Sequence, residues 1–157
     1  MLLPLFEMLE GSAIGEAVRN SLWLFPIIEV FHLVGLVVIG GGILVVDFRL
    51  LGLGLRRHPV SRLAGDVQPW VIGSLVVMIL SGVPLFLSEA IKCYYSFAFW
   101  TKMTALVLAA VFTFTVRRSV VSATDGRFPA AWNRAVAVTS LVLWSTVGWG
   151  GRWIGFS

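Results

Sequence analysis

The stretch LWLFPIIEVFHLVGLVVIGGGILVV, residues 22–46, decides the fold of this chain. Only two residues within it, Glu29 and His32, can ionise. The hydrocarbon core of a bilayer is about 30 Å thick, and a helix that rises about 1.5 Å per residue needs about 20 residues to cross it. Residues 22–46 therefore predict a transmembrane helix.

Three further stretches are candidates for crossing the membrane. In the third span, the uncharged run from Met103 to Val116 would rise only about 21 Å. This span must therefore begin near Phe97, which draws Lys102 below the membrane surface. The sequence predicts an all-α transmembrane four-helix bundle, with spans at about 22–46, 70–90, 97–116 and 135–155.

The composition also points to a membrane protein. Of the 157 residues, 58% are hydrophobic and 13% are charged, about half the charged share of a typical soluble domain. A chain of this length predicts one membrane domain over residues 1–157, with no separate catalytic domain. The single cysteine, Cys93, argues against an internal disulfide and against a cysteine-cluster metal site.

Residues 1–20 precede the first span. Their apolar side chains recur near helical spacing, which predicts a short N-terminal amphipathic helix in the membrane interface, with a disordered tail as the alternative. Glu7, Glu10 and Glu16 argue against a cleaved secretory signal, because such a signal begins with a basic region.

Cationic residues gather in two predicted loops. By the positive-inside rule these loops face the cytoplasm, so we expect a bacterial cytoplasmic membrane protein with its N- and C-termini outside. The cations flank apolar segments instead of forming a stripe, so the net charge of +4 indicates membrane topology and no nucleic-acid partner. The loop cations are Arg49, Arg56, Arg57 and Arg62 in the first loop and Arg117, Arg118, Arg127 and Arg134 in the third.

A polar site is predicted in the outer half of the bilayer. Glu29 and His32 are three residues apart on one helix face, and Lys102 and Arg152 lie at similar depth in other spans. A charged side chain at a helix centre costs about 2.5 to 3.5 kcal/mol on insertion scales. We therefore expect Glu29 to pair with Lys102 or Arg152, with His32 beside the pair.

Gly35 lies one turn after His32 on the same face, and Ile39 and Gly42 continue that face. Small residues beside a histidine could leave space for a cofactor, or could only allow another helix to approach closely. The predicted cofactor-binding residues are His32, Glu29, Gly35, Arg152 and Lys102, and the predicted metal ligands are His32 and Glu29. Haem, a metal ion and a quinone are the cofactors considered.

The segments SLWLFPIIEVFH, residues 21–32, and VDFRLLGL, residues 46–53, resemble a family of small, uncharacterised four-span bacterial membrane proteins with Glu-x-x-His in the first span. The resemblance covers most of the chain after Asn20 and implies architecture, without a particular activity. Family members often carry a second histidine near the end of the third span, where this chain has residues 113–116, TFTV. This departure argues against a cofactor held by two histidines.

Three functions are consistent with these features. The first is an accessory or redox-type membrane subunit that holds haem, a metal ion or a quinone at the buried polar site. The second is a structural or assembly subunit of a homo-oligomer or a larger membrane complex, and the third is a small transporter or proton path. No nucleophile with a base and no paired carboxylates are evident, so we do not expect the chain to be an enzyme on its own.

Overall fold

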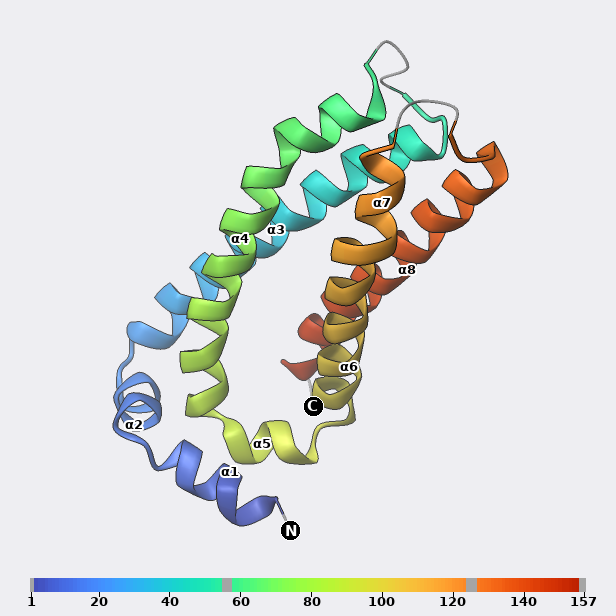
Figure 1. Ribbon diagram of the computed structural model, residues 1–157. Coiled ribbons are helices and arrows are strands. Elements are labelled where there is room, and N and C mark those ends of the chain that lie inside the picture. Colours follow the sequence, from blue (N-terminus) through green and yellow to red (C-terminus); the bar gives the residue numbers. More distant parts are fainter. Residues whose placement is uncertain (1, 55–57, 124–126, 156–157) are drawn as a thin grey trace.

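The computed structural model describes residues 2–54, 58–123 and 127–155, which are almost entirely helical (Figure 1). Arg56 and Arg57, which were assigned to the first basic loop, lie outside the described residues. The long helices are α3 (Leu24–Leu50), α4 (Val60–Ser88), α6 (Phe97–Phe112) and α8 (Ala130–Ile154). The π-helical turn η1 (Thr113–Arg117) and α7 (Arg118–Val121) extend α6, and the short helices are α1 (Leu3–Glu10), α2 (Ala13–Asn20) and α5 (Ala90–Tyr95).

Three segments are long and apolar enough to cross a membrane, namely α3, α4 and the continuous run Phe97–Val121. In the most apolar part of α3 only 17% of the residues are buried, so most of its apolar side chains face outward, as lipid contact requires. The fourth predicted span, α8, has 25 residues but is not one of the three. Hydroxyl residues such as Thr139, Ser140, Ser145 and Thr146 dilute its apolar character.

Several helix boundaries differ from the predicted ones. The single helix expected over residues 1–20 is two helices, because the chain turns at Gly11 and the Ser12 hydroxyl caps α2 by accepting from the Gly15 N–H at 3.3 Å. The helix α4 begins at Val60 instead of near residue 70, and α5 lies within a segment expected to be a loop. Apolar length marks the part of a helix inside a bilayer and gives no signal for its polar extensions.

Glycines on α3 allow α4 to pack closely against it. A Cβ added at Gly35 would lie 2.9 Å from Cγ of Met78, and one added at Gly42 would lie 2.8 Å from Cγ1 of Val67. These distances are shorter than ordinary van der Waals contact, so both positions exclude a larger side chain. Of the two alternatives considered for these glycines, the structure shows the close approach of another helix at Gly35 and Gly42. Gly41, next to Gly42, has no such neighbour.

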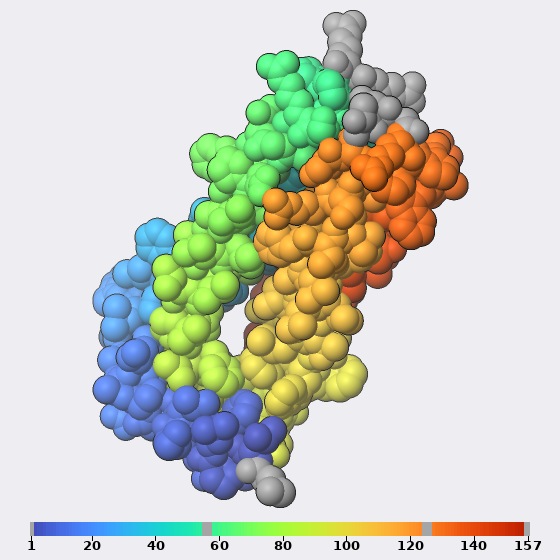
Figure 2. Space-filling view, viewed as in Figure 1, coloured from blue at the N-terminus to red at the C-terminus, as the bar shows by residue number. Residues whose placement is uncertain are grey.

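The four long helices form two antiparallel pairs, α3 with α4 and α6 with α8 (Figure 1). A buried cluster, which we call the central core, joins the pairs at mid-height. Below it α4 and α6 diverge toward α5, and the space-filling view shows an open passage between them (Figure 2). The central core consists of Ile39, Ile43, Val71, Met78, Ala105, Ala109, Trp144 and Val147.

The N-terminal helices close the α5 end of the molecule. Glu10 accepts a hydrogen bond from the Ile91 N–H at 2.6 Å and pairs with Arg19 at 3.1 Å. Arg19 donates in turn to the Ser88 carbonyl at 3.2 Å. Backbone groups at the break between α4 and α5 lack hydrogen-bond partners within a helix, and Glu10 and Arg19 provide such partners. We call these contacts of Glu10 and Arg19 the N-terminal clasp.

The C-terminal end of α3 explains why a glycine stands at position 52. Gly52 has φ +83°, its N–H donates to the Arg49 carbonyl at 3.1 Å, and the Leu53 N–H donates to the Phe48 carbonyl at 2.8 Å. This is a Schellman motif, in which the residue after the C-cap adopts a left-handed conformation that glycine accepts without strain. The helix α3 therefore ends at Leu50, and Gly52 turns the chain away from it.

The two adjacent glycines of α3 give a matched test of the packing. Gly42→Ala should lower the free energy of unfolding by about 1 to 3 kcal/mol, because the new methyl group overpacks against Val67. Gly41→Ala should be neutral or raise stability by up to about 1 kcal/mol, since alanine favours helix more than glycine. Unfolding of both variants in detergent by denaturant titration checks this, and equal stabilities would contradict it.

Candidate functional site

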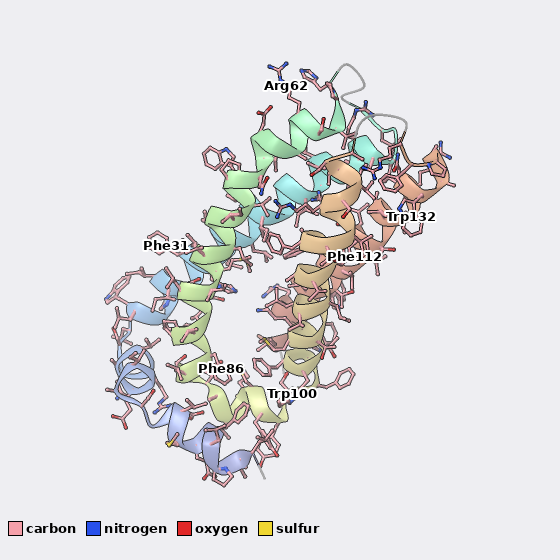
Figure 3. The ribbon with its side chains drawn as sticks, in the orientation of Figure 1. Phe31, Arg62, Phe86, Trp100, Phe112 and Trp132 are labelled. Carbon is pink, nitrogen blue, oxygen red and sulfur yellow. The ribbon has the colours of Figure 1, made fainter. Side chains whose placement is uncertain are left out.

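The passage between α4 and α6 lies between two packed layers. On one side is the central core, and on the other is an aromatic layer made by Phe6, Phe86, Tyr94, Phe99 and Trp100. Phe86 and Phe99 stack with ring centroids 5.4 Å apart and so connect α4 to α6. Figure 3 shows Phe86 and Trp100 at this end of their helices.

Each long helix contributes residues to the level between these layers. On α4, Ser81 and Gly82 come between Met78 of the core and Phe86 of the aromatic layer. On α6, Lys102 falls between Phe99 and Ala105. His32 of α3 packs onto α4 at this level, and Gly150 and Gly151 of α8 follow Val147 of the core. We call the passage at this level the opening. The residues at this level are His32, Ser81, Gly82, Lys102, Gly150 and Gly151.

His32 is half-buried and held by α4. Its Nδ1 lies 2.9 Å from Oγ of Ser81, and a Cβ added at Gly82 would lie 3.2 Å from its Cε1. The Ser81 hydroxyl donates its one hydrogen to the Val77 carbonyl at 2.6 Å, so it can only accept from His32. Nδ1 is therefore the protonated nitrogen, and in the neutral ring Nε2 carries the free lone pair.

Lys102 is half-buried against α8. A Cβ added at Gly150 would lie 3.0 Å from Cβ of Lys102, and one added at Gly151 would lie 3.3 Å from its Nζ. Within the described part of the chain, no carboxylate lies within 4.0 Å of this ammonium group. Lys102 is thus held on the α8 side of this level and His32 on the α4 side, close enough for the charge of Lys102 to act on the imidazole.

The other predicted site residues are not gathered with them. Glu29 is exposed on α3, and the expected ion pair with Lys102 is not formed. His32 turns toward α4, whereas Glu29, one turn earlier, lies outside that interface. Gly35 is covered by Met78 and the Ser74 carbonyl, so α4 fills the space expected beside it. Arg152 is exposed in the last turn of α8.

A metal site would need several donors in one place. Among residues 2–54, 58–123 and 127–155, no group of three or more His, Cys, Asp and Glu side chains is arranged to hold a metal ion. Of the two predicted metal ligands, only His32 lies in the opening, because Glu29 is exposed on α3. One imidazole is fewer donors than protein zinc or iron sites use.

A buried ion pair at the opposite end of the molecule was not predicted. Asp47 of α3 is fully buried, Arg117 of η1 is 8% exposed, and Nε of Arg117 donates to Oδ1 of Asp47 at 2.8 Å. Arg117 also reaches the Ile43 carbonyl at 3.5 Å. Ser140 of α8 lies beside the carboxylate, although its Oγ and Oδ2 of Asp47 have no hydrogen-bond partner among the described residues.

The π-helical turn brings Arg117 into this position. A π turn holds an extra residue, which rotates the next part of the helix about its axis and so changes the face that Arg117 presents. The Thr113 hydroxyl accepts a hydrogen bond from Nε1 of Trp144 at 3.1 Å, which ties the start of the turn to α8. Arg117 was assigned to the third basic loop, and this assignment is wrong because the helical run continues to Val121.

These features define a multi-pass helical membrane protein with two separate polar sites. The sequence profile of the Family of unknown function (DUF6644) matches residues 5–157, so the chain belongs to that family. No curated protein and no solved structure matches the chain. The resemblance seen in the sequence is thus confirmed at the level of an uncharacterised family, and the function has to be argued from the sites.

Breaking the buried ion pair should destabilise the protein strongly. Asp47→Asn leaves the Arg117 charge buried without compensation, and we expect a loss of about 3 to 5 kcal/mol in the free energy of unfolding. The control is Glu89→Gln, which breaks the exposed Lys92–Glu89 pair at 3.8 Å and should cost less than about 1 kcal/mol. Denaturant titration in detergent gives both values, and similar losses would show that burial of the first pair does not matter.

The Cys93 thiol should react slowly with alkylating reagents in the folded protein. Burial, with a smaller contribution from Glu89, raises the pKa of the Cys93 thiol to about 11. Because the thiolate is the reactive form, alkylation by iodoacetamide at pH 8 should be slow and should accelerate with pH until about 11. Mass spectrometry of folded and denatured samples measures this rate, and rapid labelling of folded protein at pH 8 would contradict the burial.

Proposed function

We propose that this protein is an accessory, redox-type membrane subunit that binds the head group of a quinone in the opening between α4 and α6. The observation that carries the proposal is Lys102, a half-buried cation with no acidic partner within 4.0 Å in the described part of the chain. Such a cation is costly inside a membrane unless another group compensates it. A ligand oxygen in the opening would be that group.

The donors and acceptors of the opening match a quinone in both oxidation states. The Lys102 ammonium group would donate to one carbonyl oxygen. His32, with Nδ1 fixed by Ser81, would accept through Nε2 from the hydroxyl of the reduced form. The aromatic layer next to them, with the stacked rings of Phe86 and Phe99, offers apolar surface for the ring of the ligand.

The route of entry also favours a lipid-soluble ligand. The passage is open between α4 and α6 (Figure 2). Both helices expose apolar side chains, such as Leu80 and Val83 of α4 and Met103 of α6. A quinone dissolved in the bilayer would enter sideways without crossing water. A quinone needs only hydrogen bonds and apolar surface, whereas a bare metal ion needs more protein donors than His32 supplies.

The membrane arrangement proposed with this function is four spans, with α8 as the fourth. The helix α1 and the last turn of α8 both lie at the α5 end (Figure 1), as an even number of crossings requires. The cations at the other end, including Arg49, Arg62 and Arg118, support an inside location for it. The opening would then lie in the outer half of a bacterial cytoplasmic membrane.

A structural or assembly subunit of a larger complex is the second candidate. The Asp47–Arg117 pair supports it, because buried ion pairs can fix the register between helices without binding a ligand. A proton path is less well supported, because the apolar central core separates His32 from Asp47. At that level Ile39, Ile43 and Val71 are apolar, and the buried hydroxyl of Ser74 donates to the Val71 carbonyl at 3.1 Å.

Quinone binding can be measured on the purified protein in detergent. Calorimetric titration with ubiquinone-1 should show saturable binding, and Lys102→Met should weaken it about tenfold or more, since a hydrogen bond from a charged donor contributes about 1.5 to 3 kcal/mol. The matched control is Lys92→Met on α5, whose ammonium group is exposed and should not matter.

Two results would reject the proposal. One is the absence of any saturable binding together with no quinone in a solvent extract of the protein. The other is equal affinity of the wild type and Lys102→Met. A Soret band would indicate that the ligand is haem and not a quinone. A bound metal that is lost in His32→Ala would indicate a metal ion.

A further inference from the structure

A cavity of about 310 Å³ lies at the other end of the molecule, between the first half of α4 and the η1–α7 segment. Its apolar floor includes Val46, Val71 and Ile72, which come from α3 and α4. It shares no residue with the opening, and the central core lies between the two sites.

The rest of the cavity wall is polar and cationic. Gln68, Arg117, Arg118 and Ser122 contribute to it, and no carboxylate is among the described residues that line it. The charge of Arg117 is compensated by Asp47, so Arg118 provides the free positive charge. Arg118 is exposed and has no acidic partner within 4.0 Å in the part of the chain that the structure describes.

The position of the cavity along the helices matches the membrane interface. Arg118 lies three residues before Val121, the end of the third apolar segment, and thus about 4.5 Å from it along the axis. Side chains at this depth reach the level of lipid phosphates, while Val71 and Ile72 lie deeper, within an apolar span. A guanidinium group binds phosphate oxygens with two parallel hydrogen bonds.

We propose that this cavity binds an anionic phospholipid, with the phosphate at Arg118 and one acyl chain over Val71 and Ile72. The apolar floor distinguishes this ligand from a free phosphate ion, which would gain nothing from Val71 or Ile72. The net positive wall distinguishes it from a zwitterionic lipid, whose ammonium group finds no carboxylate in the lining. The site is independent of quinone binding.

Two glycines of α4 allow a matched test. Gly65 lines the cavity, and Gly73 does not, yet a Cβ added at either position meets nothing within 4 Å. Gly65→Leu should place a larger side chain in the cavity with no clash at its Cβ, whereas Gly73→Leu adds the same side chain elsewhere on the same helix. Arg118→Gln removes the cation from an exposed position, so it should not disturb folding.

Native mass spectrometry of the full chain in detergent would count bound lipids. We expect phosphatidylglycerol to be retained at least about fivefold more strongly than phosphatidylcholine of the same acyl chains. Gly65→Leu should abolish this retention, Arg118→Gln should reduce it about fivefold, and Gly73→Leu should leave it unchanged.

The proposal is overturned if both lipids bind equally, or if phosphatidylglycerol binding is the same in Gly65→Leu and the wild type. It is also overturned if inorganic phosphate alone binds and Gly65→Leu removes that binding, since the site would then recognise a free anion. Equal loss of binding in Gly73→Leu would also overturn the proposal, because the lipid would then not depend on the cavity.

Discussion

The ion pair between Asp47 and Arg117 is the contact on which the arrangement of the helices depends. Both charges are buried in a part of the chain that is otherwise apolar, so neither can be accommodated without the other. Because Asp47 belongs to α3 and Arg117 continues from α6, the pair joins one helix pair to the other at the α7 end. Together with the central core it holds the two pairs together at this end, whereas α4 and α6 diverge on the way to α5.

The two ends of the protein consequently have different chemistry. At the α5 end the helices part around His32 and Lys102, and the aromatic layer and the N-terminal clasp close the space beyond them. At the α7 end the helices are tightly joined, and polar and apolar side chains together line a cavity of about 310 Å³. The ligands that we propose differ accordingly: a quinone for the first site and an anionic phospholipid for the second.

The sequence predicts those parts of the structure that depend on single residues or on apolar length. The three apolar spans, the close packing at Gly35 and Gly42, and the helix exit at Gly52 follow from such local signals. The Asp47–Arg117 pair joins residues 70 positions apart, and its formation depends on a π turn that has no sequence signature. The pair of Glu29 with Lys102, one of the two alternatives expected, is not formed among the described residues, because helical spacing predicts the face of a residue but not the neighbour that packs on it.

The π turn before Arg117 has a consequence for comparing relatives of this chain. Each residue of an α-helix advances by about 100° around the axis, and a π turn absorbs one residue more than an α-helical turn. A relative one residue shorter within 113–116 could therefore form an uninterrupted α-helix and still direct its arginine toward α3. A single-residue gap at this point in an alignment would thus not change the packing. Arg117 and the first arginine after the gap in such a relative should be treated as equivalent positions.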